Sequence, residues 1–232
     1  MSDAAAVLER TPAWLIQEAG PVPYAAAFDR MHDLAEKRLR GEIPDTVILL
    51  EHPPVYTAGK RWSPDHVRWA REAIEAAGAE FHVIDRGGSV TFHGPGQLVA
   101  YPILDLGVRP DVARYVHDLE EVVIRACGAA EIHGLGRNPI NSGVWAGERK
   151  VCAIGVRVTR MRVTLHGLAL NCSTDLRWFD AIVPCGLQDQ GVTSLTELAG
   201  RQVTVGQMAP LLADAFAEVF GWTFTPEPAP SR

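Results

Sequence analysis

Three strand-like segments follow one another near the middle of the chain, with no helix between them. They span Ser142–Trp145, Val151–Thr159 and Arg162–Asn171, and each is rich in apolar and β-branched residues. The links Ala146–Arg149 and Arg160–Met161 are short enough to be hairpin turns. Strands joined in this way pair antiparallel. The sequence therefore predicts an antiparallel meander as the central part of a sheet.

The first sixty residues have the order strand, helix, strand, loop. Ala13–Gln17 is a predicted strand, and Tyr24–Arg40 has apolar residues at helical spacing up to the helix stop Gly41. The continuous apolar run Thr46–Leu50 is typical of a buried strand. Two prolines and a glycine in Glu51–Lys60 predict an irregular loop, either the wall of a substrate cleft or a rigid surface turn.

The remaining elements are predicted from periodicity and from turn residues. Asp111 is a suitable cap for a helix that Gly128 ends. We expect one domain over residues 1–232, with a Pro-rich disordered tail over 226–232. The predicted helices span Asp65–Ala77, Asp111–Cys127 and Gln207–Phe220, with a short helical piece near Thr196–Leu198, and the strands span Phe81–Asp85, Leu98–Leu104 and Trp222–Thr225.

Composition excludes several classes of protein. A formal charge of −6 argues against nucleic acid as the main partner. No apolar run approaches the ~20 residues of a membrane helix, and the first residues do not form a signal peptide. The four cysteines (Cys127, Cys152, Cys172 and Cys185) contain no CxxC pair, so we expect no disulfide framework, no metal and no cofactor. A cytoplasmic location fits this cysteine usage.

The stretch Arg86–Gln97 has the most distinctive chemistry. It places four glycines, an arginine, a histidine and two hydroxyl residues between apolar segments. Glycine-rich loops let backbone N–H groups approach an anion or a developing oxyanion. No Gly-Lys-Ser/Thr closes the stretch, so it is not a Walker A loop. We interpret it as a functional loop rather than a plain hairpin turn.

A second unusual stretch, Asp180–Leu187, places Cys185 between Pro184 and Gly186. The proline fixes φ and the glycine allows a ligand to approach the backbone closely. A thiol on such a turn can be presented to a substrate. Alternatively, Cys185 is a buried structural cysteine, as free cysteines often are.

Four stretches, taken together, resemble one family. They read LEHPPVYTAG at 50–59, RGGSVTFHGPGQ at 86–97, KVCAIG at 150–155 and PCGL at 184–187. In this order and at this spacing they resemble the bacterial octanoyltransferases of lipoate biosynthesis. The resemblance runs from about residue 46 to residue 190.

The resemblance implies an α+β fold like that of the biotin- and lipoate-protein ligases, with a mixed β-sheet and flanking helices. It also implies that an octanoyl group passes from octanoyl-acyl carrier protein to one lysine of a lipoyl domain. The implied acceptors are the acyltransferase (E2) subunits of 2-oxoacid dehydrogenases and the glycine cleavage H protein. No nucleic acid and no membrane takes part.

The resemblance also implies roles for particular residues. Cys185 matches the nucleophile, and Lys150 matches the residue that lowers the pKa of that thiol. The residues that match the acyl site are Arg86, Gly87, Gly88, Ser89, Val90, Thr91, Phe92, His93, Ala153, Ile154, Gly155, Gly167, Leu168 and Ala169.

The chemistry is consistent with these roles. Moving an acyl group from a thioester to an amine requires a nucleophile that is also a good leaving group, and a thiolate is both. Free cysteine has a pKa of about 8.5, so a nearby cation such as Lys150 would increase the thiolate fraction near neutral pH. Sequence rules alone do not link residues 150 and 185, and an exposed hairpin lysine is the alternative.

Other readings stay open. An ATP-dependent lipoate- or biotin-protein ligase of the same fold would need no cysteine, and a binding module would form no covalent acyl adduct. His93 could support a loop or assist proton transfer, whereas His166 reads as a packed residue. We also expect Arg149 and Arg160 to lead a basic patch, with Arg157 and Arg162, that docks the acidic carrier protein.

Overall fold

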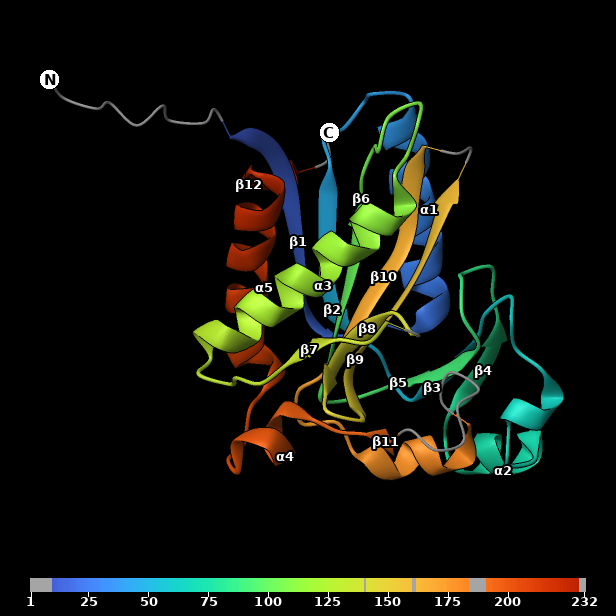
Figure 1. Cartoon of the computed structure of the whole chain (residues 1–232). Coiled ribbons are helices and arrows are strands. Elements are labelled where there is room, and N and C mark those ends of the chain that lie inside the picture. Colours follow the sequence, from blue (N-terminus) through green and yellow to red (C-terminus); the bar gives the residue numbers. More distant parts are fainter. Residues whose placement is uncertain (1–9, 140, 160–161, 184–190, 230–232) are drawn as a thin grey trace, which may run out of the picture.

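The computed structural model of the chain describes residues 10–139, 141–159, 162–183 and 191–229. Its larger sheet has the strand order β12-β1-β2-β6-β10-β9-β8-β7, and β11 pairs with β9 (Figure 1). The strands are β1 (Thr11–Pro21), β2 (Thr46–Glu51), β6 (Gln97–Ile103), β7 (Gly136–Arg137), β8 (Gly143–Ala146), β9 (Arg149–Thr159), β10 (Val163–Asn171), β11 (Gly191–Val192) and β12 (Trp222–Pro226).

The sheet is mixed, as predicted. Strands β12, β1 and β2 are parallel to one another, whereas β2, β6, β10, β9, β8 and β7 pair antiparallel in that order. The predicted meander is confirmed as β8, β9 and β10, and the first hairpin turn lies between Ala146 and Arg149. The second predicted turn, Arg160–Met161, lies outside the described residues.

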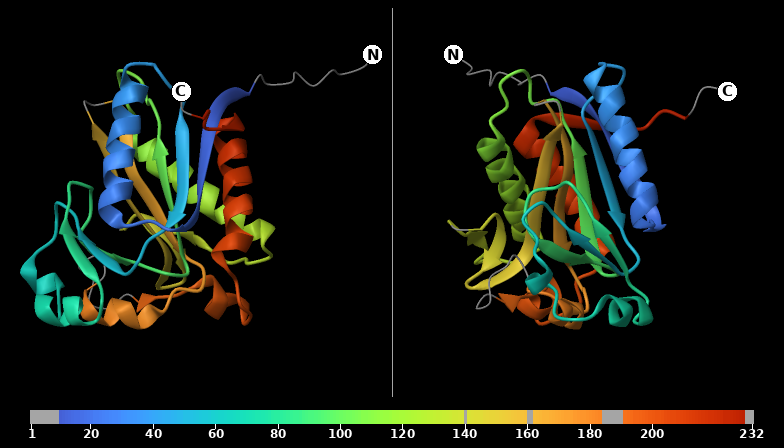
Figure 2. Two further views of the ribbon diagram at one scale, coloured as in Figure 1. Left: turned by 180° about the vertical axis from the view of Figure 1, so that it is seen from behind. Right: turned by 90° about the vertical axis from the view of Figure 1, so that its right-hand side faces the viewer.

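Helices cover both faces of the larger sheet. Helix α1 (Tyr24–Leu39) packs on one face, and α3 (Val112–Ala129) and α5 (Val205–Phe220) pack on the other (Figure 2). The Asp111 side chain caps α3 by accepting a hydrogen bond from Arg114 N at 2.9 Å. The helix continues past the predicted stop at Gly128 to Ala129. These layers confirm the predicted α+β class.

A smaller sheet with the order β4-β3-β5 lies beside the larger one. Its strands are β3 (Val55–Ala58), β4 (Glu80–Val83) and β5 (Val90–His93). Two of them correct the sequence analysis, because β3 lies within the expected loop Glu51–Lys60 and β5 within Arg86–Gln97. The prolines and glycines flank these four-residue strands and do not interrupt them, so regular pairing is possible between them.

The predicted helix over Asp65–Ala77 is also corrected. A 3₁₀ turn, η1 (Pro64–His66), is followed by extended backbone at Val67, which forms a bridge with Ile182. Only α2 (Arg71–Ala76) is helical after that. Pairing with the 181–183 segment therefore replaces the first part of the expected helix. The other short helices are η2 (Leu176–Ala181) and α4 (Leu195–Ala199).

At the C-terminal end of the described residues, Pro226 ends β12 and the Glu227 carboxylate pairs with Arg30 at 2.6 Å. The expected disordered tail stays a prediction. Among the helices of the described residues, none combines the length and the apolar character that a membrane crossing requires.

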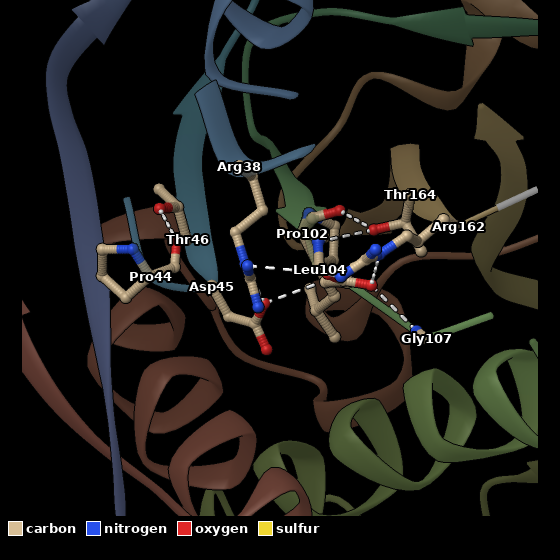
Figure 3. Close-up of polar contacts among 10 residues, drawn as sticks. Arg38, Pro44, Asp45, Thr46, Pro102, Leu104, Gly107, Arg162 and Thr164 are labelled. Carbon is tan, nitrogen blue, oxygen red and sulfur yellow. Dashed lines mark hydrogen bonds and ion pairs between the residues drawn. The ribbon is translucent and has the colours of Figure 1, made fainter. Parts of the chain in front are cut away.

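The pairing between β6 and β10 is interrupted in the middle of the sheet. Direct pairing runs from Asn171 to Leu168, and beyond it Pro102 has no N–H to donate. The Thr164 hydroxyl bridges the break, donating to Pro102 O at 2.7 Å and accepting from Leu104 N at 2.8 Å (Figure 3). Gly167 lies at the same place, where a Cβ would be only 2.2 Å from Ala100 O.

Candidate active site

A cavity of about 470 Å³ is lined by residues of both sheets. The smaller sheet supplies β5 and the segment before it, and the larger sheet supplies the middle of β9 and β10. Stretches that lie far apart in the sequence, including 86–93, 150–156 and 166–169, therefore meet at one place.

The cavity contains nearly all of the predicted acyl-site residues. The predicted residues that line it are Arg86, Gly87, Gly88, Ser89, Val90, Thr91, His93, Ala153, Ile154, Gly155, Gly167, Leu168 and Ala169. The resemblance therefore named residues that do share one cavity, although the structure by itself assigns none of them a role in binding.

Phe92 is the exception. Its side chain is fully buried in the core of the smaller sheet and stacks on Trp178, with ring centroids 5.2 Å apart and planes 7° apart. Phe92 does not line the cavity, whereas Val90, Thr91 and His93 of the same strand do. The structure thus places the Phe92 side chain outside the cavity lining, and its role in the acyl site stays a prediction.

Lys150 lies at the start of β9 with its side chain in the cavity lining. The residue is only 6% exposed, so it is not a solvated hairpin lysine. Its Nζ donates to Ser142 O at 3.1 Å and to Asn141 Oδ1 at 3.3 Å. The ammonium also lies 4.6 Å from the ring centroid of Trp145, a cation–π contact. These three contacts at the cavity wall are all with neutral groups.

Cys185 lies outside the described residues, so its distance from Lys150 stays a prediction. The other three cysteines are buried free thiols. Burial raises the pKa of Cys127 to about 12 and raises the pKa values of Cys152 and Cys172 well above the usual range. Those three thiols are therefore protonated near neutral pH and are poor nucleophiles.

Arg86 is a buried residue whose guanidinium supports the cavity wall. It donates to Thr57 O at 2.6 Å, to Thr57 Oγ1 at 3.1 Å and to Gly87 O at 2.9 Å. The neighbouring chain must approach closely, because a Cβ on Gly59 would lie 2.8 Å from the guanidinium and 2.7 Å from Gly88 O. The glycine of the 50–59 stretch is thus needed for space, and Arg86 joins β3 to the loop before β5.

His93 is held from both ring nitrogens. Gln97 Nε2 donates to Phe92 O and to Asn171 Oδ1, so Gln97 Oε1 is the acceptor that faces His93 Nδ1 at 2.8 Å. Nδ1 therefore carries the proton, and Nε2 accepts from the Thr57 hydroxyl at 3.2 Å. Burial lowers the pKa of His93 to about 3, which keeps the ring neutral. These contacts favour the supporting role over proton transfer.

The same polar chain reaches the backbone of Lys150. Asn171 Nδ2 donates to Thr193 O at 3.0 Å, and Thr193 N donates to Lys150 O at 3.0 Å. Gln97, Asn171 and Thr193 are all buried. A continuous set of hydrogen bonds thus connects the glycine-rich stretch with the strand that carries Lys150.

Several lining residues were missed by the sequence analysis. Tyr24 comes from the start of α1 and Tyr101 from β6, and both look like ordinary core aromatics in the sequence. His166 was correctly predicted as a packed, hydrogen-bonded residue, being 3% exposed with Nε2 at 3.0 Å from Asp85 Oδ1, but it also lines the cavity. Asn141 and Ser142 precede β8 and carry no residue-type signal. The further lining residues are Arg61, His66, Ile84, Val116 and Val156.

The predicted basic patch is not supported. Arg149 begins β9 and Thr159 ends it, so the two ends are about 33 Å apart, and Arg160 itself lies outside the described residues. Arg149 pairs with Glu197 at 3.3 Å, and Arg162 Nε lies 2.7 Å from both carboxylate oxygens of Asp105. Arg149, Arg157 and Arg162 are spread along the sheet, and each has an acidic partner from another element.

Sequence comparison defines the class of protein. Residues 23–217 match the family described as the Lipoyl protein ligase A/B catalytic domain. An octanoyltransferase of Rubrobacter xylanophilus is 48% identical over 203 residues, which cover 87% of this chain and 91% of the relative. A mitochondrial octanoyl-acyl-carrier-protein:protein N-octanoyltransferase of Danio rerio is 44% identical and covers 89% of this chain and 92% of its own. The chain belongs to the octanoyltransferase family.

Structural comparison agrees with the fold. A crystal structure of lipoate-protein ligase A bound with ATP superposes with a TM-score of 0.75, covering 94% of this chain and 88% of the other. At 15% sequence identity this likeness concerns the fold alone. The lipoate-protein ligase-like fold expected from the sequence is therefore confirmed.

Proposed function

We propose that this octanoyltransferase, whose donor is octanoyl-acyl carrier protein, passes the octanoyl group to a lysine of a lipoyl domain through a thioester on Cys185. The observation that carries the proposal is the buried Lys150 ammonium at the wall of a cavity that also collects the predicted acyl-site residues. Burial raises the pKa values of Cys127, Cys152 and Cys172, which makes these three thiols poor nucleophiles and supports the choice of Cys185.

In the first half-reaction, the Cys185 thiolate attacks the carbonyl carbon of the octanoyl thioester. A new carbon–sulfur bond forms, and the bond to the pantetheine sulfur then breaks. The ammonium of Lys150 stabilises the thiolate before attack and gives a proton to the departing pantetheine sulfur. Backbone N–H groups next to the cysteine hold the oxyanion, and such a donor contributes about 3 kcal/mol.

In the second half-reaction, the neutral amine of the target lysine attacks the acyl-cysteine. An amide bond forms as the bond to the Cys185 sulfur breaks, and the amine proton passes to Lys150. The enzyme returns to its starting protonation state, with no oxidation and no nucleotide consumed. Because donor and acceptor visit the same cysteine in turn, the kinetics are ping-pong.

The octanoyl chain lies along β9 and β10. Burying six or seven methylenes contributes about 5 kcal/mol, which is sufficient to hold the chain in an apolar slot. Ala153 and Leu168 supply apolar wall, and the missing side chains of Gly155 and Gly167 let neighbouring segments pack closely against these strands. The acyl group is thus recognised by shape and burial.

The acceptors that we propose are the lipoyl domains of 2-oxoacid dehydrogenase E2 subunits and the glycine cleavage H protein. Their lysine must enter without its proton to act as a nucleophile. We place the reaction in the cytoplasm, where the buried thiols Cys127, Cys152 and Cys172 would stay reduced.

Turnover without ATP tests the proposal. The purified protein, octanoyl-acyl carrier protein and a lipoyl domain should yield octanoylated lipoyl domain in the absence of nucleotide. Cys185→Ser and Lys150→Met should each lose at least about a hundredfold in kcat/KM, the scale of losing a nucleophile or its activating cation. A Cys185→Ser variant that keeps wild-type activity, with ATP and free octanoate required, would establish the rival ligase reaction instead.

A further inference from the structure

Residue Asp85 comes directly before the glycine-rich stretch and joins it to the larger sheet. Its carboxylate forms an ion pair with Arg157 of β9 and accepts from His166 Nε2 of β10 at 3.0 Å. In the β9–β10 register, Leu165 pairs with Arg157 and His166 with Val156, so both partners lie on adjacent rungs. One carboxylate thus connects the loop to two neighbouring strands.

The backbone of His166 is unusual in a way that serves this contact. Its φ is +59°, in the left-handed region that residues other than glycine rarely adopt. By strand alternation, His166 would share the face of Leu168 and Leu170, which pack toward α3 and α5. Instead, its N–H contacts Met31 Sδ at 3.0 Å and its ring lies 6.1 Å from Phe28, both on α1.

The interrupted β6–β10 pairing makes this reversal possible. Next to His166, Pro102 cannot donate to the ladder and Gly167 has no Cβ, so the His166 side chain alone can turn to the α1 face, while the rest of β10 keeps its alternation. Local irregularities of this kind persist only where the surrounding structure holds them, and they cluster at functional sites. Here the irregularity turns the imidazole toward Asp85 at the edge of the cavity.

The loop held by Asp85 forms a wall over one part of the cavity. Gly87 N donates to Val156 O at 3.0 Å. A Cβ on Gly155 would lie 3.1 Å from both Gly87 O and Arg86 Cδ, so the wall touches β9 directly. The Lys150 side chain extends along β9, because its Cε lies 3.4 Å from the position of a Cβ on Gly143, which pairs with Ala153. From Ala153 to Gly155 the strand advances about 7 Å. An octanoyl chain with its carbonyl near Lys150 spans about 9 Å, whereas a butanoyl chain spans only about 4 Å. The wall therefore faces the far half of the longer chain.

We propose that Asp85, acting through Arg157 and His166, is a positioning residue that fixes this wall and so favours octanoyl over short acyl chains. The inference rests on the proposed function and adds a determinant of specificity to it. Asp85 and Arg157 are 33% and 32% exposed at their side chains, so replacing either leaves no fully buried charge. The chemistry at Cys185 and Lys150 stays the same when the wall loosens.

The test compares octanoyl- and butanoyl-pantetheine as donors for the full-length wild type and for Asp85→Asn, Arg157→Gln and the double variant. Each single variant should raise KM for the octanoyl donor and lower the octanoyl-to-butanoyl ratio of kcat/KM about 4- to 15-fold, the loss expected when one or two methylenes lose contact. kcat should change little. The double variant should resemble the single variants, because both substitutions break the same Asp85–Arg157 ion pair.

A matched control is Asp175→Asn, which removes another aspartate–arginine pair, to Arg177 at 2.6 Å, outside the cavity lining. Its acyl-chain ratio should equal that of the wild type. An unchanged octanoyl-to-butanoyl ratio of kcat/KM in both Asp85→Asn and Arg157→Gln would overturn the positioning role of Asp85, even if the melting temperatures of these variants fall. Failure of the wild type to transfer octanoyl through Cys185 would instead overturn the proposed function, so the two failures are distinguishable.

Discussion

Thr57 offers a sharp test of the buried polar network behind the cavity. Its hydroxyl accepts from Arg86 Nη2 at 3.1 Å and donates to His93 Nε2 at 3.2 Å, and the residue is completely buried. Thr57→Val keeps the shape of the side chain but removes both bonds. The imidazole nitrogen is then left without a donor, whereas Arg86 still reaches Thr57 O.

The expected loss in the free energy of unfolding follows from leaving one buried hydrogen-bond acceptor, His93 Nε2, without a donor. Such a group costs about 1–3 kcal/mol, so we expect Thr57→Val to lower the free energy of unfolding by about 2 kcal/mol. For a chain of this size, that corresponds to a fall in melting temperature of about 4–8 °C. Thr57→Ser keeps the hydroxyl and loses one methyl group, which costs about 1 kcal/mol.

Urea unfolding of the two variants beside the wild type gives the comparison, with activity measured in parallel. Thr57→Val should be less stable than Thr57→Ser, and its KM for the octanoyl donor should rise because Arg86 and His93 both line the cavity. A Thr57→Val protein as stable as the wild type, or more stable than Thr57→Ser, would refute the hydrogen-bond ordering assigned to this network.

Three further outcomes follow from the structure. Burial lowers the pKa of His52 to about 4 and those of His93 and His166 to about 3. The pKa of a histidine in the unfolded chain is near 6.5, so the unfolded state binds protons first as the pH falls. The free energy of unfolding should therefore decrease below about pH 6.5, by about 2 kcal/mol per histidine at pH 5, as measured by urea unfolding at several pH values. Phe92→Ala should lower the free energy of unfolding by about 3–5 kcal/mol, while the KM for the octanoyl donor, measured on folded protein, stays near the wild-type value. Arg149→Glu should leave the KM for octanoyl-acyl carrier protein within about twofold, since Arg149 pairs with Glu197 and lies apart from the other arginines; a large increase would restore the docking patch.

Long periodic segments were predictable from the sequence. The helices α3 and α5 and the meander β8, β9 and β10 were found because their apolar spacing agrees with their final surroundings. The short strands β3 and β5 were missed, because four residues between prolines and glycines carry no periodicity. Their stability comes from pairing with β4 and with each other, which depends on contacts far apart in the sequence.

The site was predicted in its chemistry more than in its geometry. The resemblance located the glycine-rich stretch and the Lys150 segment, but it could not show that the Phe92 side chain packs into the core of the smaller sheet. It also could not show that Lys150 is buried, because that depends on Asn141, Ser142 and Trp145 folding over it. The turn of His166 toward Asp85 required a backbone conformation that no local sequence rule predicts.

Intact-mass spectrometry after mixing the protein with octanoyl-acyl carrier protein, without ATP and without acceptor, examines the covalent intermediate itself. We expect one added octanoyl group, located by peptide mapping to Cys185, lost when a lipoyl domain is added, and absent in Cys185→Ser. An unmodified protein that nevertheless turns over, or an acyl group on another residue, would contradict the thioester mechanism.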